Sequence, residues 1–358
     1  MSDQQSKPLR IAVGMSGGVD SSAAAARLVD DGHEVVGFTA HLWAEGSRCC
    51  SLDDAIRARH IAHFLGFEHF VIDAVDFFKE RIVEEFVEEY TRGRTPSPCV
   101  LCNQVVKFGL LLRDAVELGC THVATGHYAR LERREDGWHL LRGADRQKDQ
   151  SYFLHRLNQS QLEHILLPLG EWTKEETRSY ASERGLPLVS GAHESQDLCF
   201  VTDDGYVAFI EGRHPGLGRE GPIVDTSGNE LGRHNGFHHF TVGQREGIGV
   251  ASDKRLYVTE VRPDTNTVVV GSREETERDR CSVRDPHWIL GKAPSEGSEF
   301  LVQLRYRHPG VKATVHFVDE GTVEARFSEP QFGVAPGQAA VFYDGDEVVG
   351  GGWIEGNG

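Results

Sequence analysis

The feature that most constrains this chain is a glycine-rich turn near its N-terminus. Residues 14–22 read Gly-Met-Ser-Gly-Gly-Val-Asp-Ser-Ser, between an apolar run at 11–13 and a helix-forming run at 21–29. Gly17 and Gly18 allow a positive φ and let backbone amides approach a bound anion closely. A turn that ends a strand and opens a helix aims several N–H groups and the positive end of the helix dipole at one point. The sequence therefore predicts a phosphate-binding loop.

The side chains of this turn strengthen the prediction and exclude two common nucleotide motifs. Ser16, Ser21 and Ser22 supply hydroxyl donors, and Asp20 can cap the helix or help hold a metal ion. An ordinary capped strand–helix turn is the simpler interpretation, but it rarely combines two glycines, three serines and an acid. The turn lacks the Gly-Lys-Ser/Thr ending of a P-loop and the spacing of a dinucleotide fingerprint. It instead resembles the pyrophosphate loop of ATP pyrophosphatases, which adenylate a substrate and release pyrophosphate.

Length and composition describe an ordinary globular protein. A chain of 358 residues with 39% hydrophobic and 26% charged residues is expected to form two or three domains. No apolar run reaches membrane-spanning length, and the first ten residues lack a signal-peptide core, so we expect a cytoplasmic protein with no membrane partner. The net charge of −17 argues against nonspecific nucleic-acid binding through bulk charge, but it leaves room for a local basic groove.

Strand-like and helix-like stretches alternate through the first half of the chain. We expect strands at 34–41, 70–72 and 122–125, and helices at 52–65, 77–90 and 103–118. This rhythm predicts an α/β fold with a doubly wound parallel sheet covered on both faces. Ligands of such sheets bind at the carboxyl ends of strands. The loop at 16–22 and the tripeptide at 126–128 lie at two such ends.

The second half changes character near residue 203. Helical patterning runs through 159–165 and 174–184, whereas 212–249 is rich in glycine, charge and histidine without long helices. A hairpin is expected from 256–261 and 267–270, followed by strand-type stretches at 300–307, 311–318, 322–327 and 339–343. These patterns predict three domains: a phosphate-loop domain at 1–205, a central β-rich domain at 206–276, and a C-terminal β-barrel at 277–358.

The seven cysteines are too few and too scattered for a disulfide scaffold. Cys99 and Cys102 form a Cys-x-x-Cys in a proline-stiffened loop that opens a helix, where a thiol pKa is lowered. Cys199 follows a polar stretch. The pair can be half of a zinc site, a redox pair or chance, and with Cys199 it could also ligate an iron–sulfur cluster. A four-cysteine zinc site is disfavoured because no second Cys-x-x-Cys exists.

The remaining cysteines carry weaker signals. Cys120 and Cys281 are expected to be small buried apolar groups, and the vicinal pair Cys49 and Cys50 is ambiguous.

Many motifs in one order give the chain a specific resemblance over essentially its whole length. It resembles the bacterial-type tRNA-specific 2-thiouridylases, members of the ATP pyrophosphatase (PP-loop) superfamily. The matching segments are 14–22, 93–96, 101–103, 107–108, 124–128, 148–154, 199–200, 241–245, 305–307 and 336–343.

The resemblance implies a chemistry and a set of site residues. ATP with Mg²⁺ activates the C2 oxygen of a wobble uridine that is flipped into the site. Sulfur arrives as a persulfide on Cys199, with Cys102 as the nucleophile that frees it or assists its attack on C2. The resemblance implies no residue dedicated to a resident metal. The implied ATP-binding residues are Gly14, Met15, Ser16, Gly17, Gly18, Val19, Asp20, Ser21, Ala40 and Gly126.

The resemblance also implies partners. The substrate is a tRNA, of the lysine, glutamate and glutamine acceptors, and a cysteine desulfurase or a persulfide relay protein donates sulfur. The implied tRNA-contacting residues are Ser97, Pro98, Cys99, His127, Asp149, Gln150, Ser151, Arg305, Tyr306 and Gln338. Arginine and tyrosine suit phosphate contact and base stacking, although Arg305 and Tyr306 could also be an ordinary exposed strand pair.

Two positions depart from the family pattern, and other functions stay open. Cys99 stands where some members carry an acidic residue, which leaves the general acid or base unassigned. Ala40 stands where relatives often present a larger apolar residue to adenine. The alternatives are another ATP pyrophosphatase, such as a tRNA lysidine synthetase-like or amidotransferase-type enzyme, an iron–sulfur-dependent tRNA thiolase, or a noncatalytic RNA- or nucleotide-binding protein with a decayed site.

Overall fold

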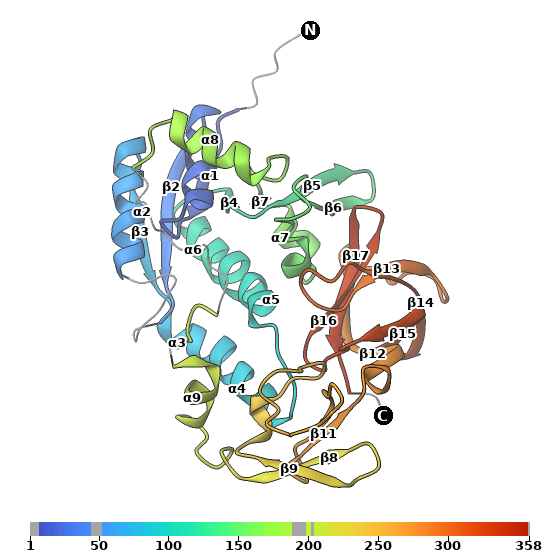
Figure 1. Ribbon diagram of the computed structural model, residues 1–358. Coiled ribbons are helices and arrows are strands. Elements are labelled where there is room, and N and C mark those ends of the chain that lie inside the picture. The colour runs from blue at the N-terminus through green and yellow to red at the C-terminus, as the bar shows by residue number, and fades with distance from the viewer. Residues whose placement is uncertain (1–6, 44–51, 188–197, 202–203, 357–358) are drawn as a thin grey trace. The chain divides into compact units, whose positions relative to one another are not determined.

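The computed structural model describes residues 7–43, 52–187, 198–201 and 204–356 (Figure 1). Cys49, Cys50 and the polar stretch before Cys199 lie outside the described residues. The chain divides into two compact units, and each is described by itself. The first unit comprises residues 1–81, 99–202 and 346–348, and the second comprises 82–98, 203–345 and 349–358.

A parallel sheet forms the centre of the first unit. Its strand order is β3-β2-β1-β4-β7, and every neighbouring pair is parallel. The strands are β1 (Arg10–Gly14), β2 (Glu34–His41), β3 (His69–Asp73), β4 (His122–Ala124) and β7 (Ile165–Leu166). Ile11, Ala12 and Val13 on the central strand are fully buried. Successive side chains of a strand point to opposite faces, so this burial means that both faces of the sheet are covered. The doubly wound α/β prediction is confirmed.

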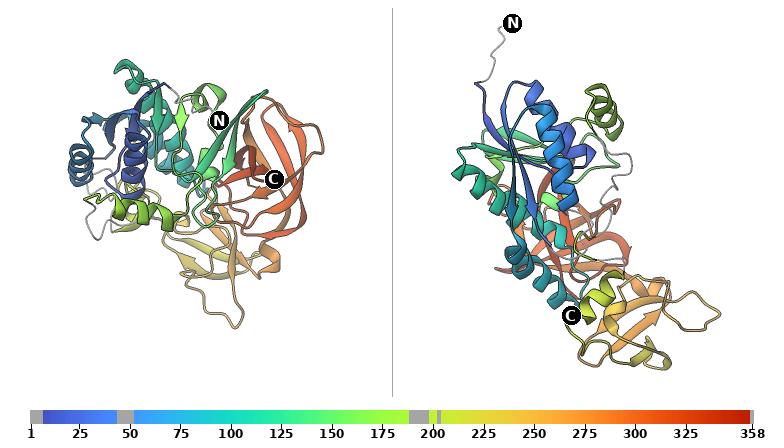
Figure 2. Two further views of the ribbon diagram at one scale, coloured as in Figure 1. Left: turned by 90° about the horizontal axis from the view of Figure 1, so that it is seen from above. Right: turned by 90° about the vertical axis from the view of Figure 1, so that its left-hand side faces the viewer.

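Helices cover both faces of this sheet (Figure 1; Figure 2, right). The helices α1 (Val19–Asp30) and α2 (Leu52–Leu65) bury Ala25, Leu28, Ala58 and Ile61 against β1 and β2. On the other face, α6 (Leu111–Glu117) contacts β1 and β4. The helix α8 (Lys174–Glu183) packs against α1.

Three expected helices differ from the observed ones. The helix expected at 103–118 begins earlier, as α5 (Pro98–Cys102), and continues as the wide π-turn η2 (Asn103–Leu110) into α6. Proline suits the first position of a helix because its missing N–H would have no intrahelical partner there. A second π segment, η1 (Lys79–Val83), separates α3 (Val75–Phe78) from α4 (Glu84–Thr91). The helix expected at 159–165 is only α7 (Gln159–Leu162), because Ile165 joins the sheet as β7.

A hairpin that the sequence patterning did not reveal completes the first unit. It consists of β5 (Ala129–Arg134) and β6 (Gly137–Arg142), and β6 also pairs with Glu347 and Val348. The short helix η3 (Ser151–Leu154) follows.

The second unit contains a four-stranded sheet in the order β10-β11-β8-β9. Its strands are β8 (Gly221–Asp225), β9 (Glu230–His234), β10 (Tyr257–Arg262) and β11 (Thr267–Gly271). The expected β10–β11 hairpin is confirmed, with Asn266 at a φ of 50° in its turn. The second unit also contains the helix α9 (Gly205–Glu211) and the short helices η4 (Phe237–His239) and η5 (Glu274–Thr276).

The C-terminal strands form a closed antiparallel barrel (Figure 2, left). Its strands run in the order β12-β15-β14-β13-β16-β17, and β12 pairs with β17 to close the ring. They are β12 (Glu277–Trp288), β13 (Glu299–Gln303), β14 (Val311–Asp319), β15 (Thr322–Phe332), β16 (Ala339–Asp344) and β17 (Glu347–Ile354). Alternating side chains such as Val302, Val315 and Phe342 fill its interior. The predicted barrel is confirmed. Among the described helices, none is both long and apolar enough to cross a bilayer.

Candidate functional site

The predicted phosphate loop leaves the carboxyl end of β1 and enters α1. Gly17 takes a φ of 71° and Gly18 is the N-cap of α1. Hydroxyls hold the turn: Ser21 Oγ accepts from the Ser16 amide at 3.2 Å and lies 3.3 Å from Ser16 Oγ, while Ser22 Oγ donates to the Gly18 carbonyl at 2.8 Å. By helix geometry the first amides of α1 have no intrahelical acceptor. The loop is therefore preorganised to receive an anion.

Two glycines of the site lie against backbone where a side chain has no room. A Cβ on Gly17 would come within 2.9 Å of the Asp54 carbonyl oxygen and Arg57 Cβ of α2. A Cβ on Gly126, just after β4, would come within 2.7 Å of the Asp20 carbonyl carbon and 2.8 Å of the Ser21 nitrogen. The two predicted strand-end segments therefore meet, and Gly126 sets how closely they approach.

Asp20 is held by a lysine and a tyrosine from other elements of the first unit. Lys174 Nζ, at the start of α8, lies 2.7 and 2.8 Å from the two Asp20 carboxylate oxygens. The Tyr128 hydroxyl donates to Asp20 Oδ1 at 2.8 Å, and burial raises the pKa of Tyr128 above its ordinary value. The Asp20 side chain does not cap α1, so of its two predicted roles the capping role is wrong. Instead, it fixes a buried ammonium beside the loop.

Sequence reasoning missed Lys174 although a signal was present. Thr173 and Glu176 form a capping box at the start of α8, which places Lys174 at the first helical position. A cation at the first helical position is unfavourable, because it lies at the positive end of the helix dipole. Burial of a lysine is also unfavourable, and Lys174 is buried. A residue that is unfavourable in both respects commonly has a functional role.

The edge of the site beside β2 is formed by Met15, Thr39 and Ala40. The Met15 amide donates to the Phe38 carbonyl at 2.7 Å, which continues the parallel pairing beyond β1. Thr39 Oγ1 donates to the Met15 carbonyl at 2.7 Å and lies 2.8 Å from His69 Nε2. Burial lowers the pKa of His69 to about 4, so this imidazole is neutral at pH 7. Ala40 is half-buried at the end of β2.

The described cysteines differ in burial. Cys102 is buried at the end of α5, Cys99 is exposed, and Cys199 is partly exposed. Cys120 and Cys281 are buried, and burial raises the pKa of the Cys281 thiol to about 12. Both are inert apolar groups, as predicted.

Four predicted tRNA-contacting residues of the first unit are tied into its own structure. Asp149 is buried, and its carboxylate accepts from the Gly143 and Ser151 amides at 3.0 and 3.1 Å and from Arg142 at 3.0 Å. Ser151 is fully buried, and Gln150 Oε1 accepts from the Tyr128 amide at 3.0 Å. His127 lies 2.7 Å from Thr125 Oγ1, and burial lowers its pKa well below the usual value.

The other predicted tRNA-contacting residues belong to the second unit, except Cys99. Arg305 is exposed, Tyr306 is half-buried, and the Arg307 guanidinium lies 5.3 Å from the Tyr306 ring centroid. Gln338 Nε2 donates to the Thr95 carbonyl at 2.8 Å, and the Thr95 amide donates to the Pro336 carbonyl at 2.7 Å. Gln338 thus holds the segment that contains Ser97 and Pro98 and leads directly to Cys99.

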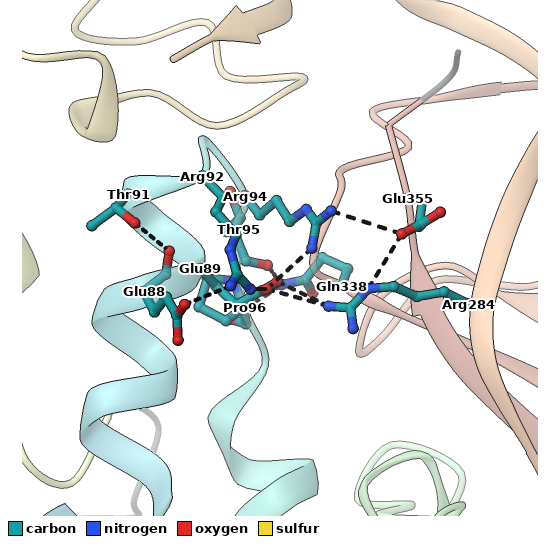
Figure 3. Close-up of polar contacts among 10 residues, drawn as sticks. All are labelled: Glu88, Glu89, Thr91, Arg92, Arg94, Thr95, Pro96, Arg284, Gln338 and Glu355. Atoms are coloured by element: carbon teal, nitrogen blue, oxygen red, sulfur yellow. Dashed lines mark hydrogen bonds and ion pairs between the residues drawn. The ribbon is translucent and has the colours of Figure 1, made fainter. Parts of the chain in front are cut away.

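A buried carboxylate anchors the start of the same segment (Figure 3). Glu89, whose side chain is 4% exposed, pairs with Arg92 at 3.2 Å, Arg94 at 3.1 Å and Arg284 at 3.2 Å. Arg94 and Arg284 also reach Glu355, at 3.7 and 3.6 Å. We call Glu89 with these three arginines the Glu89 cluster. It ties α4, the 92–96 segment and β12 together within the second unit.

Three family models match consecutive parts of the chain. They are described as a tRNA methyl transferase HUP domain over residues 9–203, a tRNA methyl transferase PRC-barrel domain over 208–272, and an aminomethyltransferase β-barrel domain over 278–354. With the loop at the end of β1, they define a HUP-domain protein of tRNA modification joined to two β-rich domains.

Full-length relatives make the family specific. The chain is 47% identical to the tRNA-specific 2-thiouridylase MnmA of Geobacter metallireducens, covering 97% of this chain and 96% of that protein. It is 45% identical to the protein of the same name from Magnetococcus marinus, and 41% identical to that from Halothermothrix orenii, each covering 97% of this chain and 99% of the relative. The chain belongs to the tRNA-specific 2-thiouridylase family.

Proposed function

We propose that this chain is an ATP-dependent sulfurtransferase that converts the wobble uridine of a tRNA to 2-thiouridine. The observation that carries the proposal is the preorganised loop of residues 14–21 at the end of β1, in a chain that matches 2-thiouridylases along nearly its whole length. Another ATP pyrophosphatase, such as a lysidine synthetase-like enzyme, is not favoured, because the full-length relatives carry the 2-thiouridylase name.

The loop serves the activation step in this proposal. The C2 oxygen of the uridine attacks the α-phosphate of ATP, pyrophosphate leaves, and the oxygen becomes part of an AMP leaving group. Amides and hydroxyls of residues 14–21 bind the phosphates, and Gly126 keeps the second strand end clear of them. Ala40 contributes to the adenine side of the site.

In this proposal Mg²⁺ binds together with ATP, as part of the substrate. Both Asp20 oxygens already contact Lys174 Nζ, so this carboxylate does not fit the role of a separate magnesium ligand. The Lys174 ammonium instead supplies a fixed positive charge beside the loop, held in place by Asp20 and Tyr128.

The two cysteines supply the sulfur. A cysteine desulfurase or a relay protein places a persulfide on Cys199, and its exposure suits that delivery. Cys102 attacks the persulfide, a Cys102–Cys199 disulfide forms, and the released hydrosulfide adds to C2 as AMP leaves; alternatively, Cys102 assists direct attack by the persulfide. In the first route a two-electron reductant restores the thiols before the next turnover.

The tRNA contacts remain part of the proposal. Ser97, Pro98 and Cys99 receive the target base, and Arg305, Tyr306 and Gln338 contact the tRNA from the β-rich domains. His127, Asp149, Gln150 and Ser151 take part through the turns that they build, because Asp149 and Ser151 are buried. The domains at 1–205, 206–276 and 277–358 act together in the cytoplasm on lysine, glutamate and glutamine acceptors.

A reconstituted thiolation reaction tests the proposed function. The full chain is incubated with an unmodified lysine-acceptor tRNA transcript, a persulfide donor, Mg²⁺ and ATP. We expect 2-thiouridine, AMP and pyrophosphate in equal amounts, and no product when the α–β bridging oxygen of ATP is replaced by a methylene group. Thiolation without ATP, or a requirement for stoichiometric iron in anaerobically prepared protein, would contradict the proposed mechanism.

A further inference from the structure

Two neighbouring histidines and one carboxylate converge in the second unit, and the proposed function assigns a role to none of the three. Glu211 is the last residue of α9, and His238 and His239 lie in η4. His238 Nε2 and His239 Nε2 each lie 3.1 Å from the same oxygen, Glu211 Oε1. The two rings are nearly perpendicular, at 86°, with centroids 4.5 Å apart, so their Nε2 atoms approach this oxygen from different directions.

Hydrogen bonds leave some polar atoms of this cluster with no partner or with a shared one. The His238 side chain is completely buried, and among the described residues no group bonds its Nδ1. Its Nε2 shares a single acceptor oxygen with a second imidazole, although a carboxylate offers two oxygens.

Two of the three separations between these atoms are close to the edge length of a tetrahedral metal site. Bonds of about 2.0–2.1 Å in tetrahedral geometry separate neighbouring ligand atoms by roughly 3.3 Å. Two of the three separations here are 3.1 Å, and all three atoms lie within 4.8 Å of one another. Two imidazoles and one carboxylate are a donor set that favours zinc and similar transition metals over Mg²⁺ or Ca²⁺. The Glu211 side chain is 37% exposed, which leaves a path for an ion and a fourth position for water.

We propose that Glu211, His238 and His239 form a zinc-binding site in the central domain. The ion would join the end of α9 to η4, which rests on the domain core through Phe237 and Phe240. Residues 241–245, one of the family-matching segments, follow η4 directly. The role is structural: the ion would fix the start of that segment and would take no part in sulfur transfer.

Metal titration of the full chain tests this site. Protein stripped with a chelator is titrated with Zn²⁺ against a competing indicator, and Co²⁺ spectra report the ligand type. Wild type is expected to bind one ion at a site without thiolate-to-cobalt bands, and to melt at a higher temperature with Zn²⁺. Glu211→Gln and His239→Gln should weaken this site by more than about 100-fold, since even loss of an outer-shell partner costs about 10–100-fold.

A control variant and the possibility of zinc binding at cysteines determine which results would overturn the proposal. His316→Gln removes an imidazole that pairs with one exposed carboxylate, Glu296, at 2.7 Å, and should leave zinc binding unchanged. Circular dichroism confirms that each variant is folded. The proposal is overturned if wild type and His239→Gln bind equal amounts of zinc with equal affinity, as binding only at cysteines would give. It is also overturned if no nitrogen- and oxygen-ligated Co²⁺ spectrum appears in wild type.

Discussion

Single atoms decide how the loop and the neighbouring strand end fit together. Gly126 has no Cβ, and its backbone lies against Asp20 and Ser21 at the start of α1. The same two residues carry the Ser21 amide at the start of α1 and the carboxylate that holds Lys174. A change at Gly126 therefore acts on the proposed phosphate binding through backbone position, without removing any polar group.

Replacing Gly126 by alanine should disable the activation step. The new methyl group would meet backbone atoms at 2.7–2.9 Å, so the loop must shift, at a cost of about 1–3 kcal/mol. A displacement approaching 1 Å in a positioning element costs about 100-fold in rate. We expect ATP-dependent AMP release with tRNA to fall by about that factor while the protein stays folded.

Gly216→Ala is the control for this substitution. Nothing lies within 4 Å of a Cβ at Gly216, so activity should be unchanged. Equal AMP release by Gly126→Ala and Gly216→Ala would show that the close approach is not required.

The role of a residue could be predicted from the sequence where the local backbone geometry favours one residue type. Gly17, with its positive φ, and the serines of the loop were evident from the sequence because no other residues suit such a turn. Lys174 could not be paired with Asp20 in advance, because 154 positions separate them and only the packing of α8 on α1 joins them. Likewise, Asp149 is a polar residue whose burial depends on a turn that the sequence does not mark.

Among the elements, the segment before Cys99 depends most on contacts distant in sequence. Gln338 holds Thr95 from the turn before β16, and the Glu89 cluster fixes Arg94 and the end of α4 (Figure 3). A buried carboxylate with three arginines is costly to disrupt, because its removal leaves several cations without their shared partner.

Glu89→Gln should therefore destabilise the second unit. The arginine side chains are 25–48% exposed, so solvent screens part of the loss, and we expect about 1–3 kcal/mol in urea unfolding. The adjacent Glu88, 54% exposed and paired with Arg92, is the matched control, and Glu88→Gln should cost less than about 0.5 kcal/mol. Comparable losses in the two variants would argue against an anchoring role for Glu89.

Element types followed from the sequence better than element boundaries did. Continuous apolar runs identified β1 and β2, which are buried on both faces. Helical patterning identified α2, and two apolar runs around a turn sequence identified the β10–β11 hairpin. The sequence patterning missed the β5–β6 hairpin and both π segments. β5 is mostly charged and shows no apolar alternation, and β6 has two adjacent leucines, which also break a period of two. The wider turn of a π-helix leaves the surrounding helical pattern intact.

The negative net charge of the whole molecule disfavours binding of the proposed substrate, because tRNA is also negatively charged. A charge of −17 repels tRNA at long range, so binding must rest on local contacts and shape, as the sequence suggested. The first unit contains both the proposed phosphate loop and the two cysteines. In our account the loop makes the uridine oxygen leave and the cysteines supply the sulfur that replaces it.

Single-turnover transfer of labelled sulfur tests this division of roles between the loop and the cysteines. The full chain is loaded with radiolabelled sulfur by a cysteine desulfurase, separated from it, and mixed with tRNA and ATP. Wild type should carry the label on Cys199 and deliver it to 2-thiouridine only with ATP. Cys199→Ser should take up no transferable label, Cys102→Ser should hold the label without delivering it, and Cys120→Ser, which changes a buried thiol, should match wild type. Label reaching tRNA from Cys199→Ser at the wild-type rate would contradict the account.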